Sequence, residues 1–267
     1  MRNIFITAIA TVAFASAVTA EEVAATGAAL GGNINVEITE NAAGDYVATT
    51  TLGVSIEADG IAFGSASVES VDGATFELDE WNIGTHVGAA TLSFGKQGDL
   101  MVENDFEIVG GDTLAAVADD HESLQVTVGA ASVMVGLTDV TTDVTEVENV
   151  QGAYTLALGT VDVTAVGDYN FNSEEYVLGG KAAMDLTDDI AVGGLLTYES
   201  ASEAIGYELS AGYSIATVFV NGDDSDALQN VGAGVNTTIS GLNVYAEGAY
   251  NIDAEDTVVG AGISFSF

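Results

Sequence analysis

The chain ends on Thr257-Val258-Val259-Gly260-Ala261-Gly262-Ile263-Ser264-Phe265-Ser266-Phe267, where large apolar residues alternate with Gly and Ser up to the last position. Successive side chains of a β-strand point to opposite faces. The alternation therefore places five apolar residues on one face, namely Val259, Ala261, Ile263, Phe265 and Phe267. The other face carries mainly Gly and Ser. This stretch predicts a terminal β-strand with one apolar face.

The opposite end of the chain has the features of an export signal. Met1-Arg2-Asn3 is a short cationic start, residues 4–17 are an apolar run, and small residues precede Glu21. We interpret residues 1–20 as a cleaved secretory signal and residues 21–267 as one domain. After residue 20 no segment approaches the roughly 18 apolar residues of a spanning helix. An exported chain that ends on an alternating strand closed by Phe is typical of barrels in the outer membrane of Gram-negative bacteria.

The composition is strongly acidic, with 41 Asp and Glu against 3 Lys and Arg and a formal net charge of −38. After the signal, Lys96 and Lys181 are the only Lys or Arg, which excludes nucleic acid as a partner because no cationic patch can neutralise phosphates. The chain has no Cys, so disulfide frameworks and thiolate metal sites are excluded. Regular alternation with 48% hydrophobic residues argues against a disordered acidic chain.

Alternating segments separated by turn-forming clusters recur along the whole mature chain. They predict an all-β, antiparallel transmembrane β-barrel of sixteen strands, with fourteen as the alternative count. The segments are 32–39, 45–57, 60–68, 74–82, 87–96, 122–129, 131–138, 150–158, 160–169, 175–186, 189–199, 203–213, 215–221, 227–239, 241–250 and 256–267. With Phe267 at the periplasmic end, the short links fall on that side and the longer acidic links fall on the other, as outer-membrane barrels require.

The alternation also predicts the direction of each side chain. Apolar residues such as Val135 and Leu156 would face lipid, while carboxylates at alternate positions would face inward, where a dry core would not accept them. The predicted pore-wall residues are Glu37, Glu77, Asp162, Lys181, Glu208 and Glu247. Two segments, 60–68 and 215–221, show no clear polar face, and Glu80-Trp81 breaks the alternation, which predicts a β-bulge.

The longest gap between predicted strands runs from Lys96 to Glu122 and forms the third link on the long-link side. A connection of this length is usually functional. It carries apolar residues such as Leu100, Met101 and Phe106, so we expect it to fold against another part of the molecule.

The stretch Ser93-Phe94-Gly95-Lys96-Gln97-Gly98-Asp99, together with Phe267, resembles the general porins of alphaproteobacteria, the sixteen-stranded Rhodobacter-type family. The resemblance covers the mature chain at the level of architecture. It implies a homotrimer and a third external loop that folds into the lumen and narrows it. On this reading the pore constriction is formed by Glu103, Asp105, Glu107 and Asp112.

The chain departs from that family in its charges. The family's porins place Arg and Lys on the wall opposite the loop carboxylates, whereas the mature chain has no Arg and only Lys181 is predicted to point inward. We therefore expect a nearly all-anionic constriction.

Enzymatic and metal chemistry have little support in the sequence. His86, placed at a predicted turn, and His121, beside acidic residues, lack any nucleophile context such as Gly-x-Ser-x-Gly. No cofactor is expected, although clusters such as Asp223-Asp224-Asp226 leave a loop-bound Ca²⁺ open as an alternative to diffuse cation condensation.

The sequence thus predicts a passive, cation-preferring channel for small hydrophilic solutes and ions, surrounded by outer-membrane lipid. One alternative is a structural or adhesive outer-membrane barrel with a plugged lumen, against which we set inward glycines such as Gly232 and Gly262. A second alternative is a soluble, secreted β-sandwich or adhesin repeat.

Overall fold

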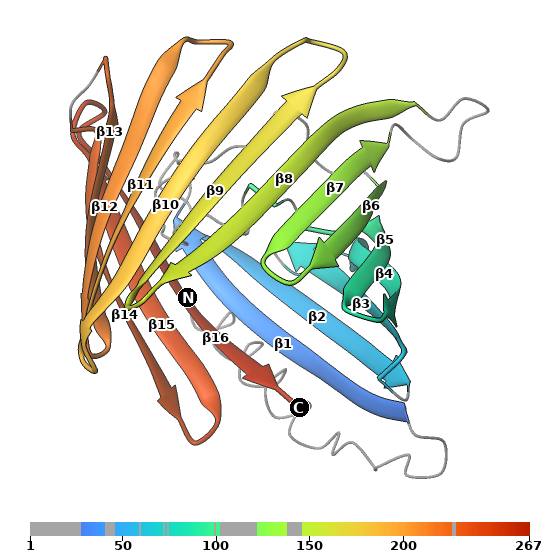
Figure 1. Cartoon of the computed structure of the whole chain (residues 1–267). Coiled ribbons are helices and arrows are strands. Elements are labelled where there is room, and N and C mark those ends of the chain that lie inside the picture. Colours follow the sequence, from blue (N-terminus) through green and yellow to red (C-terminus); the bar gives the residue numbers. More distant parts are fainter. Residues whose placement is uncertain are drawn as a thin grey trace.

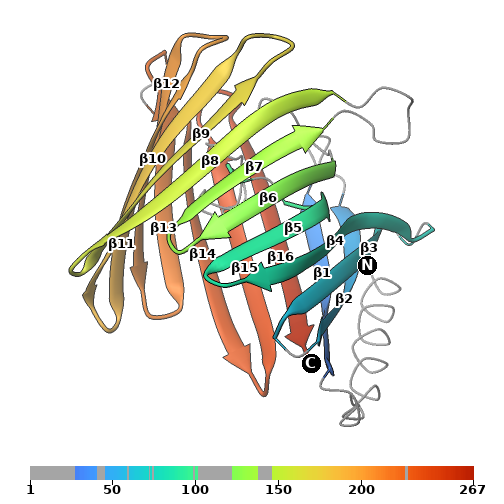
Figure 2. The same cartoon turned by 45° about the vertical axis from the view of Figure 1, so that its right-hand side comes forward.

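The computed structural model describes residues 28–40, 46–58, 60–71, 73, 75–98, 100–101, 122–137, 146–225 and 228–267. They form sixteen strands: β1 (Ala28–Glu40), β2 (Tyr46–Ala58), β3 (Ala62–Val71), β4 (Glu77–Val87), β5 (Ala90–Lys96), β6 (Glu122–Val128), β7 (Ala131–Leu137), β8 (Val147–Leu158), β9 (Val161–Asn170), β10 (Tyr176–Thr187), β11 (Ile190–Glu199), β12 (Ala204–Tyr213), β13 (Ala216–Asp223), β14 (Asn230–Ile239), β15 (Leu242–Asn251) and β16 (Asp256–Ser266). Each strand pairs antiparallel with its neighbours in sequence, and β1 pairs with β16, so the sheet is a closed barrel (Figures 1 and 2). The predicted fold and the count of sixteen are confirmed.

The described ranges contain no helix that is long and apolar enough to cross a bilayer. The predicted signal, residues 1–20, lies outside the described residues and stays a prediction.

The seam of the barrel joins the first and last strands. β1 and β16 are paired from Asn33↔Ser266 to Thr39↔Gly260, and the terminal residue extends the ladder through two 2.9 Å bonds between the backbone groups of Gly32 and Phe267. Because its backbone pairs on both sides, β16 has no free edge.

The two ends of the barrel differ in the length of their links. At the end that carries Phe267, consecutive strands are separated by two residues, except for the three residues 59–61. At the opposite end the links have between 4 and 25 residues. The predicted separation of short from long links is confirmed. One boundary was wrong: the β4–β5 turn lies at 88–89 and has Gly88 at φ 63°, so His86 belongs to β4.

The two faces of the sheet differ in chemistry. Outward side chains such as Val54, Leu156 and Leu196 are large, apolar and exposed. The inward positions are mainly polar, and this includes the two segments whose sequence showed no clear polar face. Ser65 and Ser67 of β3 pair with inward positions of β2, and Asn221 of β13 pairs with Glu208.

The predicted β-bulge is present in β4. Ala66 pairs with Trp81 and Val68 with Leu78, so that Asp79 and Glu80 together oppose Ser67. A bulge of this kind inserts one residue without reversing the faces beyond it. Leu78 and Trp81 both keep outward positions, and the two carboxylates share the inward face.

Three inward aromatic rings lie over glycines on the next strand. Tyr245 covers Gly262, Phe219 covers Gly232 and Phe63 covers Gly84; a Cβ at any of these glycines would collide with the ring. The glycines are therefore platforms for aromatic side chains. Our interpretation of Gly232 and Gly262 as open lumen space was wrong, because rings occupy the space above them.

We expect Gly262→Ala to destabilise the barrel by about 1–3 kcal/mol, since its methyl group would displace the Tyr245 ring. Gly180→Ala is the matched control, because a Cβ at Gly180 meets no atom within 4 Å. Urea unfolding followed by the heat-modified mobility of the barrel on gels measures the difference. Equal stability of the two variants would show that the Tyr245 ring packs as well over Ala as over Gly at position 262.

Arg at outward Val135 or Leu156 should cost about 2–4 kcal/mol in bilayers if the site lies near the membrane midplane. Asn at inward Thr127 or Thr155 should cost much less, because each threonine already hydrogen-bonds another hydroxyl at 2.9 Å, to Ser132 and Thr164. Reversible folding into lipid vesicles measures both. Equal damage on the two faces would indicate a dry core.

Candidate functional site: the lumen wall

The long link between β5 and β6, residues 97–121, begins with hydrogen bonds between polar side chains of the two strands and Gln97. Gln97 accepts a bond from Ser93 Oγ at 2.8 Å and donates from Nε2 to Ser123 Oγ at 3.1 Å. Both serines are buried inward residues of β5 and β6. Gly95 has φ 152°, and a Cβ there would collide with the carbonyl of Trp81, so only Gly fits. These contacts explain the residues at positions 93, 95 and 97 of the Ser93 to Gly98 stretch.

The described start of the link then docks on the inner wall formed by β8 to β11. The Leu100 amide donates to Gln151 Oε1 on β8 at 2.9 Å, and Leu100 is 2% exposed. Met101 is fully buried in a cluster with Val166, Val177 and Leu195, packed beside Ala153.

The strands that receive Leu100 and Met101 are β8 to β11, and the contacted side chains are inward in register. Val166 lies two positions from Thr164 and from Asp168 and shares their inward face, and Leu195 pairs with Lys181. Leu100 and Met101 therefore lie on the lumen side of the wall, and for these two residues the prediction that the link folds against another part of the molecule is confirmed. The path of the rest of the link, including Glu103, Asp105, Glu107 and Asp112, lies outside the described residues, and the constriction stays a prediction.

The predicted wall residues Lys181 and Glu208 lie in one transverse row. Lys181 on β10 pairs with Leu195 on β11, which pairs with Glu208 on β12. Glu208 is 1% exposed, so this carboxylate is enclosed by protein. Lys96, by contrast, is the last residue of β5 and lies on the same outward face as Phe94.

Glu37 and Glu247 lie near each other at the seam. Glu37 pairs with Gly262 of β16, and the ring of Tyr245 crosses that glycine, which brings its hydroxyl to the side chains of Glu37 and Asn35. Thr39 Oγ1 donates to Glu37 Oε1 at 3.2 Å. Glu247 lies on the same strand as Tyr245, two positions away and on the same face. This cluster ties β15, β16 and β1 together inside the barrel.

Glu77 and Asp162 lie apart from these groups and are exposed. Glu77 begins β4 and opposes Glu69 of β3 near the long-link end, while Asp162 is the second residue of β9, beside the short turns. The six predicted wall residues are therefore distributed along the height of the barrel and do not form one ring.

Sequence reasoning missed a network of amides on the inner wall. Asn251 Nδ2 donates to Asn230 Oδ1 at 3.0 Å, and Asn230 Nδ2 donates to Asn221 Oδ1 at 2.8 Å, in the row that contains Glu208. On β8 and β9, Asn149 donates to Asp168 at 3.0 Å. The alternation signals that these residues face inward, but their pairing depends on register between strands.

The carboxylates considered for Ca²⁺ organise turns where the structure describes them. Asp223 Oδ1 accepts from the amide and hydroxyl of Ser225 at 2.8 and 2.6 Å, and its Oδ2 accepts from Gln229 at 2.7 Å. Asp226 lies outside the described residues. A loop-bound Ca²⁺ stays a prediction.

The inner wall is covered unequally. On β8 to β14, inward residues such as Asn149, Thr164 and Asn221 are buried. On β2, the inward Ser55 and Glu57 are exposed. Near the short turns, inward residues of the other wall are exposed too, including Asp162 and Thr217. Away from these turns, the inward side chains of β1 to β4 are less buried than those of β8 to β14, so we call β1 to β4, which lie opposite the wall that receives Met101, the open wall of the lumen.

The natural chain has no Cys, so the docking of Met101 can be tested with a single introduced thiol. A maleimide should label Met101→Cys at least tenfold more slowly than Ser173→Cys, an exposed position in the β9–β10 link. Adding Gln151→Ala should accelerate labelling at position 101, because it removes the acceptor for the Leu100 amide. Equal rates at positions 101 and 173 would contradict the docking.

No family model matches the chain, and no curated protein matches it. Among solved structures, a mutant of Rhodopseudomonas blastica porin aligns with a TM-score of 0.67 and 16% identity, covering 90% of this chain and 100% of that one. An anion-selective porin from Comamonas acidovorans aligns with a TM-score of 0.56 and 13% identity, covering 90% of this chain and 99% of that one. OmpF of Salmonella typhi, solved with daunomycin, gives a TM-score of 0.58 and 9% identity, with coverage of 90% and 97%. In fold, the chain resembles the Rhodobacter-type porins.

Proposed function

We propose that the protein is a porin: a water-filled channel in the outer membrane of a Gram-negative bacterium, through which small hydrophilic solutes and ions diffuse passively. It prefers cations and performs no chemical step. The observation that carries this proposal is the division of the closed sheet into an exposed apolar outer face and a polar inner face. Backbone groups can be satisfied in lipid by a closed barrel.

Cation preference is supported by charge. The chain has 41 acidic residues, and inward positions of the described barrel carry carboxylates such as Glu37, Glu69 and Glu247, whereas its inward cation is Lys181. Fixed negative charge along a narrow aqueous path raises the local concentration of cations. The fold alone leaves the sign of selectivity open, because a structurally similar porin is anion-selective. The charges of this particular lumen are therefore the argument.

A constriction formed by the long link is supported by its first residues. Gln97 turns inward at β5 and β6, and four residues later Met101 is buried on β9 to β11. We infer that a link that begins in this way narrows the lumen with its own carboxylates, Glu103, Asp105, Glu107 and Asp112. A homotrimer is proposed on the resemblance alone.

The rival proposal is a structural or adhesive barrel with a plugged lumen. The burial of much of the β8 to β14 wall favours it, while the exposed polar wall along β1 to β4 favours an open path. Conductance decides between them, because a plugged barrel passes no steady ion current. A soluble β-sandwich is disfavoured by the many large apolar side chains exposed on the outside of the barrel.

In a planar bilayer with a salt gradient, the reversal potential should have the sign of cation selectivity and should weaken as ionic strength rises. Replacing Glu103, Asp105, Glu107 and Asp112 together by Gln or Asn should shift it toward zero, because the amides keep size and polarity but remove charge. Anion preference of the natural protein would contradict the proposal.

A companion variant separates charge from shape in the same experiment. Deleting residues 102–115 should increase single-channel conductance and the size limit for neutral solutes, whereas the four amide substitutions should leave the size limit nearly unchanged. If the deletion leaves both quantities unaltered, the link lies outside the lumen and the constriction is wrongly assigned.

A further inference from the structure

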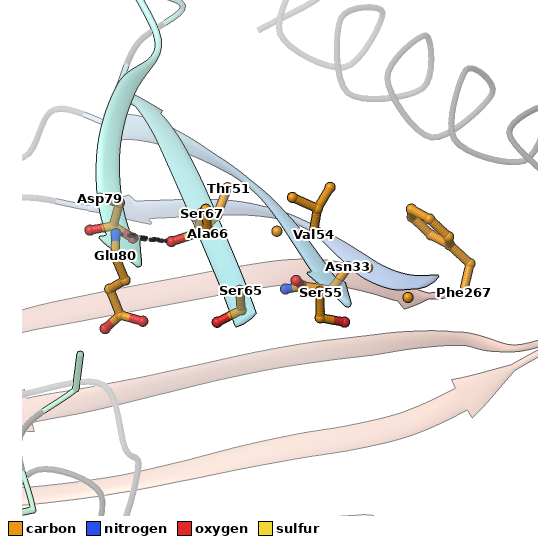
Figure 3. Close-up of a pocket in the computed structure, with 13 residues that line it drawn as sticks. Asn33, Thr51, Val54, Ser55, Ser65, Ala66, Ser67, Asp79, Glu80 and Phe267 are labelled. Atoms are coloured by element: carbon orange, nitrogen blue, oxygen red, sulfur yellow. Dashed lines mark hydrogen bonds between the residues drawn. The ribbon is translucent and has the colours of Figure 1, made fainter. Parts of the chain in front are cut away.

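The open wall of the lumen contains a hollow of about 550 Å³ on β1 to β4 (Figure 3). Its size lies within the range of small-molecule sites, about 300–1,000 Å³. The lining is rich in hydroxyl groups, supplied by Thr51, Ser55, Ser65 and Ser67. Gly31 and Gly53 occupy inward positions of the lining, and the Asn33 side chain lies over Gly53, where it adds an amide to the hydroxyl groups.

Two carboxylates complete this hollow, and the β-bulge is the reason both are there. Asp79 and Glu80 are consecutive, and in a regular strand one of them would point into the lipid. The bulge gives both to the inward face opposite Ser67. In Figure 3, Glu80 projects to the same side as Ser55 and Ser65.

Ser67 holds the bulge in place through both of its hydrogen-bonding roles. Its hydroxyl donates to Asp79 Oδ2 at 3.2 Å and accepts from the Glu80 amide at 3.1 Å (Figure 3). The acidic pair is thus anchored from the neighbouring strand, while Thr51, Ser55 and Ser65 add hydroxyl groups beside it.

The chemistry of the lining selects a class of solute. The lining residues include no Lys, Arg or His, so it disfavours anions, and its side chains are mainly polar, so it offers little to an apolar ligand. Carboxylates accept hydrogen bonds from an ammonium group with charge assistance, and hydroxyl and amide groups both donate and accept. The best match is a small organic cation that also carries hydroxyl groups.

We propose that this hollow is a weak binding site for hydroxylated ammonium solutes, such as amino sugars, on the permeation path. The proposal rests on the channel function proposed above and deepens it by naming a solute class. Because the hollow opens to the lumen, we expect dissociation constants on the order of millimolar, which lets a solute bind and leave during passage.

Saturation-transfer NMR on the detergent-solubilised protein tests binding without requiring conduction. Protonated glucosamine should bind at least tenfold more tightly than glucose or N-acetylglucosamine, which match its ring but lack its charge. The double variant Asp79→Asn with Glu80→Gln should lose at least tenfold in glucosamine affinity. Equal binding of glucose and glucosamine, or unchanged affinity in the variant, would overturn the proposal.

The matched control is Asp188→Asn with Asp189→Asn, an exposed pair of consecutive acids in the β10–β11 turn, outside the hollow. It removes the same total charge and should leave glucosamine affinity within twofold. If it weakens binding as much as the Asp79 and Glu80 variant, the effect is general electrostatics and the site is wrong.

Two further measurements separate the contribution of the hydroxyl groups to binding from that of the carboxylates. Ser55→Ala with Ser65→Ala should weaken glucosamine but leave methylammonium unchanged, because only glucosamine has hydroxyls for those serines; an equal effect on both would contradict the hydroxyl contacts. In bilayers, glucosamine should reduce the ion current through the natural channel and not through the Asp79 and Glu80 variant. A barrel that binds glucosamine but passes no current would refute the channel and keep the site.

Discussion

The structure depends on the hydrogen-bonded closure of β1 against β16. A sheet of sixteen strands with two free edges would expose rows of amide and carbonyl groups, which lipid cannot satisfy. Closure removes both edges, and the backbone of Phe267 completes it by bonding Gly32. Inside the seam, the Tyr245 ring crosses Gly262 to reach Glu37, so a side-chain contact reinforces the backbone ladder at the one junction that the chain does not connect covalently.

Closure also makes the charge tolerable. A net charge of −38 would oppose a compact soluble core, but a barrel distributes carboxylates over its links and its wet interior. Within that interior the two walls differ. The wall of β8 to β14 holds most of the buried inward residues, receives Met101 and ties its polar groups into bonds such as Asn149 to Asp168, whereas the inward residues of β1 to β4 are less buried. If solutes pass, the wall of β1 to β4 offers them the more accessible polar side chains at the middle of the barrel.

The sequence predicted the strand count, the division of links and the two faces, because these follow from a period of two and from turn residues that any single strand displays. It located the bulge from the broken alternation at Glu80 and Trp81, and it identified Leu100 and Met101 as apolar residues that need a partner.

The sequence could not predict which residues pack against Met101, because its contact with Leu195 joins residues nearly a hundred positions apart. For the same reason the Asn221, Asn230 and Asn251 network was missed, since it depends on the register of three strands. The prediction that inward glycines leave open space was wrong because a small residue does not show what packs over it. The ring of Phe219 occupies the space above Gly232.

The two faces of such a sheet are not equally free to change. Outward positions in the lipid-facing band must stay apolar, so a regular strand can offer the lumen only alternate residues. A barrel can enrich its inner surface locally in two ways, and both occur in this protein. One is to vary side-chain size across a strand pair, as where an aromatic ring lies over a glycine and leaves the outer face undisturbed. The other is to insert a residue by a bulge, which adds a second inward side chain while Leu78 and Trp81 keep their outward positions. For recognition the bulge is the stronger device, because it sets two carboxylates side by side in the lining of the hollow, where we propose that they bind a cationic solute.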